Sequence, residues 1–156
     1  MPSVIVATPQ VEEADALLGG FLRQGLAVEE IQLGRLECAA VPLLDLVVAV
    51  GGNGKAQFAV QAQHLLDHCP EAPLLVCAGT AGSLVDVLSP GDVVVATATI
   101  EHDYKERFSS EPLPSYEADA DALTGIRQAA AANTLPFRLT FGRIASGDES
   151  PSASTF

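Results

Sequence analysis

The sequence predicts an α/β fold in which amphipathic helices alternate with the strands of a mostly parallel or mixed sheet. Three observations indicate this. Short apolar runs rich in β-branched residues recur along the 156-residue chain and are bounded by glycine or proline. Helical periodicity occupies the longer intervals between them. Turns of small residues follow several of the runs, where an open α/β sheet binds its ligand.

The N-terminal elements are the first to follow from this pattern. Residues 4–7 (VIVA) predict a strand. Residues 12–24 predict a helix, because leucines and a phenylalanine recur at helical spacing and acids crowd the first turn, where they suit the helix dipole. Residues 28–33 and 36–41 predict two strands that form a hairpin around Gly34-Arg35.

The next unit is a strand, a glycine-rich turn and a helix. Residues 46–50 (LVVAV) predict a buried strand that enters the turn Gly51-Gly52-Asn53-Gly54-Lys55. The glycine and Ser/Thr positions that a phosphate loop requires are alanines here, so we interpret the turn as a close approach of backbone to ligand. His64 and His68 have metal-ligand spacing on the following helix, but without a third ligand they are interpreted as a solvated face and not a metal site.

The chain is organised around residues 74–97. Residues 74–78 and 93–98 predict strands that are buried on both faces, and Cys77 is then a small core residue of a central strand. Between them lie the turn Gly79-Thr80-Ala81-Gly82-Ser83 and a Pro90-Gly91-Asp92 corner. We expect the small-residue turn to form the floor of a small-molecule site.

The remainder of the chain continues the alternation. Residues 100–119 predict a long polar loop, which at this length is a lid or a disordered segment. Residues 120–133 predict an alanine-rich helix and residues 137–144 a strand. That strand ends in a third group of polar residues, Ser146-Gly147-Asp148-Glu149.

Composition excludes several classes of partner. Eight Lys and Arg against 20 Asp and Glu give a net charge of −12, which repels phosphate backbones and anionic lipids, so we expect neither nucleic acid nor membrane as a partner. No apolar run approaches the ~18 residues of a membrane helix, and no secretion signal begins the chain. A single cytoplasmic domain is predicted. Three cysteines without C-x-x-C spacing predict neither disulfides nor zinc.

Acidic residues follow three of the predicted strands and could perform chemistry. Glu12 and Glu13 could place a general base over the sheet edge, or they could be acids that only favour the helix dipole. Glu101-His102-Asp103 follows another strand on the edge where ligand is expected, or it is a charged loop start. No G-x-S-x-G elbow is present, which disfavours a serine hydrolase.

In this order and spacing, the motifs resemble the nucleoside phosphorylase/nucleosidase superfamily. The similarity is greatest to its hydrolytic branch, the 5′-methylthioadenosine/S-adenosylhomocysteine nucleosidases and futalosine hydrolases. It extends from Val4 to about Glu149. The matching features are the opening strand with its glutamates, the two glycine-rich turns, the Gly-Asp strand start, the His-Asp pair and Ser-Gly-Asp: Glu12-Glu13, Gly52-Asn53-Gly54-Lys55, Gly79-Thr80-Ala81-Gly82-Ser83, Gly91-Asp92, His102-Asp103 and Ser146-Gly147-Asp148.

The resemblance implies a three-layer α/β/α sandwich around a mixed central sheet. It also implies a homodimer that cleaves the N-glycosidic bond of a purine nucleoside without a cofactor or a metal. The water-activating base would be Glu12 or Glu13, because counting from the strand favours the first and counting back from the helix's leucines favours the second. Substrate-binding positions would be Asn53, Thr80, Ala81, Gly82, Ser146, Asp148 and Glu149.

Two departures from the family affect the expected activity. Cys77 stands where related phosphorylases carry a phosphate-binding arginine, so hydrolysis is preferred over phosphorolysis. The family continues beyond Ser-Gly-Asp with a ribose-binding glutamate and a Ser-Asp pair that supplies the general acid, whereas this sequence ends at Phe156. The chain is therefore expected to be a truncated nucleosidase domain, active or inactive. The alternatives are a non-catalytic nucleoside-binding or interaction module of the same fold and, from another class, a flavodoxin-like domain.

Overall fold

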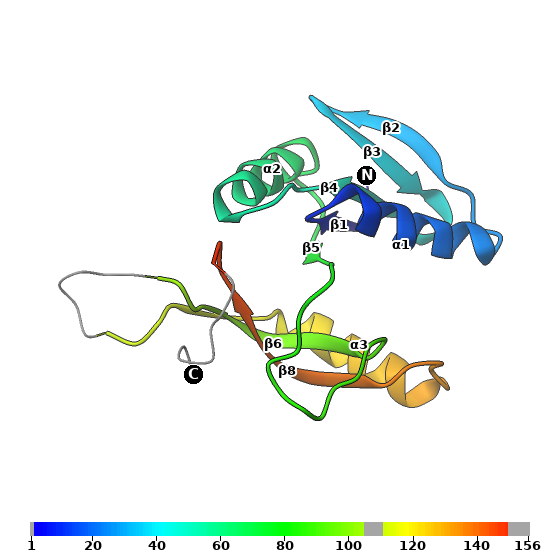
Figure 1. Cartoon of the computed structure of the whole chain (residues 1–156). Coiled ribbons are helices and arrows are strands. Elements are labelled where there is room, and N and C mark those ends of the chain that lie inside the picture. Colours follow the sequence, from blue (N-terminus) through cyan, green and yellow to red (C-terminus); the bar gives the residue numbers. More distant parts are fainter. Residues whose placement is uncertain (1, 105–110, 150–156) are drawn as a thin grey trace. The chain divides into compact units, whose positions relative to one another are not determined.

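The computed structural model describes residues 2–104 and 111–149 of the chain. These residues form two compact units, Met1–Ala81 and Gly82–Phe156, which are described separately. Residues 105–110 of the predicted long loop, and the segment after Glu149, lie outside the described residues. The predicted α/β fold class is confirmed, since both units combine a mixed sheet with α-helical structure (Figure 1).

The first unit contains a five-stranded sheet in the order β2-β3-β4-β1-β5. The apolar runs of the sequence form β1, β4 and β5, which are parallel to one another, whereas β3 runs antiparallel to both of its neighbours. The predicted elements are therefore present, with ends shifted by a residue or two. The strands are β1 (Val4–Thr8), β2 (Glu29–Leu33), β3 (Leu36–Val41), β4 (Leu46–Val50) and β5 (Leu74–Cys77).

Two helices cover opposite faces of this sheet and make the unit a three-layer sandwich (Figure 1). They are α1 (Val11–Arg23) and α2 (Lys55–His68). Alternate residues of a strand point to opposite faces, so Ile5 of β1 packs with Leu65 of α2, while Val6 packs with Ala14 of α1. Strands with both faces covered must be apolar throughout, which explains the continuous apolar runs of β1 and β4.

The β2–β3 hairpin rests against α2 in a way that the sequence did not predict. Gly34 has a positive φ of +56° at the first position of a two-residue turn, as a type II′ turn requires. A Cβ on this glycine would lie 2.5 Å from His64 Nε2 and 2.4 Å from His68 Nε2. The predicted solvated face is thus wrong for His64, which is half-buried and hydrogen-bonded to the hairpin, with 3.2 Å between the Arg35 N–H nitrogen and His64 Nε2.

Within its described residues, the second unit has a three-stranded sheet in the order β7-β6-β8 and one helix. β6 runs parallel to β8 and antiparallel to β7. Part of the predicted long loop is therefore wrong, because β6 continues to Glu101 and β7 lies within residues 100–119. The elements are β6 (Val93–Glu101), β7 (Ser115–Glu117), α3 (Ala120–Ala132) and β8 (Leu139–Ser146).

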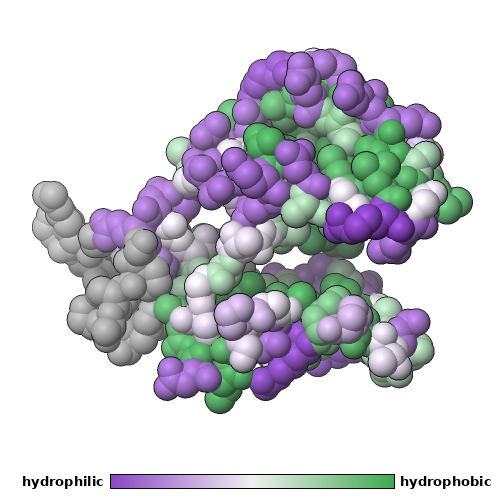
Figure 2. All heavy atoms as spheres, turned by 45° about the vertical axis from the view of Figure 1, so that its right-hand side comes forward, coloured by the Kyte–Doolittle hydropathy of each residue, from purple (hydrophilic) through white to green (hydrophobic). Residues whose placement is uncertain are grey.

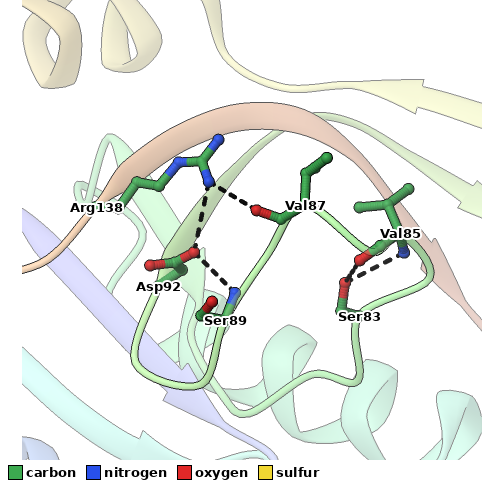
Figure 3. A network of polar contacts seen from close by, with 6 residues as sticks. All are labelled: Ser83, Val85, Val87, Ser89, Asp92 and Arg138. Atoms are coloured by element: carbon green, nitrogen blue, oxygen red, sulfur yellow. Dashed lines mark hydrogen bonds and ion pairs between the residues drawn. The ribbon is translucent and has the colours of Figure 1, made fainter.

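A network of polar contacts organises the segment before β6. Ser89 to Asp92 form a tight turn, in which the Asp92 N–H donates to the Ser89 carbonyl (3.0 Å) and Gly91 has a φ of +96°. Pro at the second and Gly at the third position suit a type II turn. Figure 3 shows Arg138 reaching this segment, where its guanidinium donates to the Val87 carbonyl (2.7 Å) and approaches the Asp92 carboxylate (4.0 Å).

Two predictions about burial are wrong. Cys77 is exposed and not a core residue, because β5 forms an edge of the five-stranded sheet. β5 and β6 are also not fully buried strands, since most of their described residues are half-buried.

On the visible surface, apolar patches interrupt the polar side chains (Figure 2). In the described part of the chain, no helix is both long and apolar enough to cross a membrane.

Candidate functional site

The first cluster of candidate residues lies in the Met1–Ala81 unit, at one edge of its sheet. β1, β4 and β5 are parallel, so their C-terminal ends meet at the same edge. The Gly51 N–H donates to the Thr8 carbonyl (2.7 Å), and the Ala78 N–H donates to the Ala7 carbonyl (3.0 Å). The turns that follow the three strands therefore start side by side.

The carboxylate of Glu13 is held at this edge by Thr80. Glu13 Oε1 accepts from the Thr80 backbone N–H (2.6 Å) and from its hydroxyl (2.7 Å). Oε2 accepts from the Gln10 N–H (3.0 Å), and this hydrogen bond also caps the start of α1. Hydrogen bonds to a charged acceptor are the stronger kind. The two residues, 67 positions apart in the sequence, are thus joined by a pair of hydrogen bonds.

Gly79 lets the turn approach this carboxylate. A Cβ at this position would lie 3.0 Å from Glu13 Oε1 and 3.0 Å from Pro9 Cδ. Real Cβ atoms rarely come so close to a neighbour, so a side chain here would force the turn or the Glu13 carboxylate to shift by a few tenths of an ångström. At Gly79, the small residue of the turn predicted as the floor of a site therefore has a steric reason, which is the close approach of Glu13.

The surroundings of Glu13 favour its ionised form. Burial opposes ionisation, but the hydrogen bonds from the Thr80 backbone, the Thr80 hydroxyl and the Gln10 backbone outweigh it and lower the pKa of the Glu13 carboxyl below its ordinary value. The carboxylate is therefore an anion at neutral pH, with polar donors on both oxygens. Such a group can accept a proton from a bound water only if the water approaches an unoccupied lone pair.

The other predicted residues of the first unit lie at the same edge without joining this network. Glu12 is exposed at the start of α1. Asn53 is exposed in the turn after β4, where Gly52 and Gly54 have positive φ values of +84° and +83°. Cβ atoms at Gly51 and Gly52 would come within 2.5 Å of side-chain atoms of α2, so the predicted tight turn needs its glycines. Ala81 is exposed at the end of this unit.

The second cluster lies in the Gly82–Phe156 unit, where parallel strands β6 and β8 end together. The His102 N–H donates to the Ser146 carbonyl (3.0 Å). Asp103 Oδ2 accepts from the backbone N–H groups of Asp148 (2.7 Å) and Glu149 (3.3 Å). The structure therefore joins the His-Asp pair to the Ser-Gly-Asp segment. Gly82, the other predicted residue of this unit, is exposed near its start.

Sequence reasoning assigned no role to Asp103, which was noted as part of a charged group after a strand and of the His-Asp pair that matches the family. The signal that could have found it is the parallel pairing of β6 and β8, because polar residues that follow neighbouring parallel strands meet at one edge. The histidine pair of α2 was noticed but interpreted as solvated. Within the described residues, no group of three or more potential metal ligands is present.

The cysteines differ in environment. Cys38 and Cys69 are buried beside the apolar core of the first unit, and Cys77 is exposed. Burial, with a further contribution from Cys69, raises the pKa of the Cys38 thiol to about 11. Cys38 is therefore a neutral thiol at physiological pH and a poor nucleophile.

Comparison with known proteins identifies relatives of this arrangement. The sequence model described as Phosphorylase superfamily matches residues 4–155. A solved 5′-methylthioadenosine/S-adenosylhomocysteine nucleosidase of Helicobacter pylori is similar over 97% of this chain and 69% of its own, with a TM-score of 0.76 and 24% identity. A futalosine hydrolase mutant of the same organism is similar over 99% of this chain and 72% of its own, with a TM-score of 0.73 and 22% identity.

A third solved structure is the 5′-methylthioadenosine/S-adenosylhomocysteine nucleosidase of Neisseria meningitidis in complex with methylthio-immucillin-A. It is 25% identical over 94% of this chain and 65% of its own, with a TM-score of 0.72. The chain thus spans between 65% and 72% of the length of these three proteins. The likeness establishes the fold that they share.

Proposed function

Because the chain belongs to the Phosphorylase superfamily, we propose that it binds a purine nucleoside and hydrolyses its N-glycosidic bond. The observation that carries the proposal is the Glu13 carboxylate, ionised and held by Thr80 at the C-terminal edge of parallel strands. The proposed substrates are 5′-methylthioadenosine or S-adenosylhomocysteine, since structural relatives carry these names. A cytoplasmic homodimer without cofactor is the proposed form of the protein.

Glu13 is the proposed base. Oε1 already accepts two hydrogen bonds from Thr80, whereas Oε2 accepts one from Gln10. A water on the remaining lone pair of Oε2 would attack the anomeric carbon. Its proton passes to Glu13, the bond from the anomeric carbon to the purine nitrogen breaks, and the electron pair leaves with the purine, which takes up a proton from solvent. Glu12 lacks this support, because it is exposed and does not share the contacts with Thr80.

Water is the proposed nucleophile in preference to phosphate. Phosphate would need cationic side chains, whereas the net charge of the chain is −12 and Cys77 lies on the strand that leads to the Glu13–Thr80 contact. The position that the resemblance associates with a phosphate-binding arginine therefore carries no positive charge. Nucleoside phosphorolysis is the less favoured reaction of the same site.

The proposal is tested by incubating the protein with 5′-methylthioadenosine and measuring free adenine by reverse-phase chromatography. Adenine release that does not depend on added phosphate is expected. The Glu13→Gln variant should lose about 10³-fold in kcat, or roughly 4 kcal/mol of transition-state stabilisation. The adjacent Glu12→Gln variant makes the same change of charge and should retain most of the activity. The reverse result would assign the base to Glu12.

A second candidate is a nucleoside-binding module that does not cleave its ligand. It is favoured by the hydrogen bonds from Thr80 and Gln10 that lower the pKa of the Glu13 carboxyl, because a carboxylate with a lowered pKa is a weaker base. Calorimetric titration with adenine and with 5′-methylthioadenosine separates the two candidates. Binding without adenine release would support the module.

A further inference from the structure

The contacts between the ends of β6 and β8 carry one inference that concerns a residue outside the predicted site. Asp103 follows β6, and its Oδ2 atom accepts from the backbone N–H groups of Asp148 (2.7 Å) and Glu149 (3.3 Å). Both donors belong to the segment that follows β8. A single carboxylate oxygen therefore joins the residues beyond one strand to those beyond its neighbour.

Two further contacts fasten the same segment. The His102 N–H donates to the Ser146 carbonyl (3.0 Å), so the backbone pairing of β6 with β8 continues one residue past Glu101. A Cβ on Gly147 would lie 2.6 Å from His102 Nε2 and 2.7 Å from Asp103 Cγ. The His-Asp pair thus packs directly on Gly147, and this close packing leaves no room for a side chain.

The chemistry of this contact is that of an anion held by peptide dipoles. Two successive N–H groups that point at one carboxylate oxygen form charge-assisted hydrogen bonds. A backbone segment with two N–H groups committed in this way has a defined direction beyond the end of the strand. The side chains of Asp148 and Glu149, which are exposed, then project from a fixed backbone.

We propose that Asp103 is a positioning residue that holds the segment Gly147-Asp148-Glu149 in the conformation that binds the nucleoside. The inference rests on the proposed function, because Asp148 and Glu149 are substrate-binding positions only as the family resemblance implies them. Asp103 acts on ligand affinity through the backbone and does not contact the reacting atoms. Its loss should therefore raise KM and the Kd for adenine and leave kcat nearly unchanged.

The first arm of the test is independent of any ligand. In Asp103→Asn one acceptor becomes an NH₂ donor and the negative charge is lost. The amides of Asp148 and Glu149 should then exchange with solvent about tenfold faster, which corresponds to the loss of one charge-assisted hydrogen bond. The exposed Glu117→Gln on β7 makes the same chemical change in the same unit and should leave these rates unchanged. Unchanged exchange rates in Asp103→Asn would show that Asp103 does not hold this segment, and would overturn the proposal.

The second arm measures ligand binding. The Kd for adenine, from calorimetry, and the KM for 5′-methylthioadenosine should rise about tenfold in Asp103→Asn, with kcat within about twofold of the parent. Gly147→Ala should produce the same pattern, since its methyl group would displace His102 and Asp103. A Kd unchanged in both variants would overturn the proposal, and so would global unfolding of Asp103→Asn by circular dichroism, because a clamp on one turn acts locally.

The two arms distinguish this proposal from the proposed function. If the parent protein binds neither adenine nor the nucleoside, the proposed function fails. The role of Asp103 in ligand binding then fails with it, even if the exchange rates show that Asp103 holds the segment. If the parent binds adenine and the Asp103 variants bind it equally well, only the positioning role fails.

Discussion

Two carboxylates, Glu13 and Asp103, tie the ends of parallel strands together in the two units of this protein. Glu13 projects from a helix and accepts a backbone N–H and a hydroxyl from Thr80 on one oxygen, and a backbone N–H from Gln10 on the other. Asp103 lies in a loop and accepts two successive backbone N–H groups on one oxygen. The first has an ionised oxygen available beside a strand edge, whereas the second orders a segment of backbone.

The units also differ in how their elements are packed. Among the described residues, nearly every fully buried apolar side chain belongs to the first unit, and Ala98 is the exception in the second. A sheet covered on both faces buries alternate residues in both directions, whereas the described residues of the second unit provide a single helix beside the three-stranded sheet. The residues around Glu13 therefore rest on a well-packed scaffold, and the residues around Asp103 depend more on local hydrogen bonds.

The largest expected effect concerns the core of the first unit. Leu65 of α2 has an exposed fraction of 0%. Leu65→Ala should lower the free energy of unfolding by about 2–5 kcal/mol, because it removes buried apolar surface and leaves a cavity. Urea unfolding followed by circular dichroism measures this. Val60→Ala, on the same helix at 59% exposure, is the control and should change stability by less than about 0.5 kcal/mol. Equal effects would contradict the assigned core.

An intermediate effect is expected at the Glu13–Thr80 contact. Thr80→Val removes the hydroxyl donor with little change of shape, and kcat/KM for 5′-methylthioadenosine should fall about tenfold, or roughly 1.4 kcal/mol. Because the lost hydrogen bond stabilised the carboxylate, the pKa of Glu13 should rise. The acid limb of the pH–rate profile should therefore move to higher pH.

Thr80→Ser is the matched control for this prediction, since it restores the hydroxyl without the methyl group. It should recover most of the activity and the original position of the acid limb. An acid limb that does not move in Thr80→Val would show that the titration of another group controls the rate.

The smallest effect is expected in the Arg138 network of the second unit (Figure 3). Arg138→Ala removes the hydrogen bond to the Val87 carbonyl and the approach to Asp92. The contact is exposed, so the free energy of unfolding should fall by only about 0.5–1 kcal/mol. Urea unfolding of Arg138→Ala and Arg138→Lys tests this, with the lysine variant intermediate. A loss above about 2 kcal/mol would show that the second unit depends on this network more than its exposure implies.

The elements could be predicted because local patterns determine them. Apolar runs bounded by glycine and proline became strands, and acids at a helix start became the first turn of α1. The errors arose where burial depends on distant parts of the chain. Cys77 lies in an apolar run, but nothing local indicates that β5 is an edge strand. His64 lies on the polar face of its helix in the sequence pattern, yet the turn at Gly34 packs on this side chain.

The candidate site divides in the same way. The sequence by itself determined the family resemblance, the small-residue turn and the presence of two adjacent glutamates after the first strand. Consecutive helical residues point about 100° apart, so only tertiary structure could decide that Glu13, and not Glu12, meets Thr80. Its role as base stays a prediction. The contacts of Asp103 likewise depend on the parallel pairing of β6 and β8, because long-range packing and not local sequence determines which strands are neighbours.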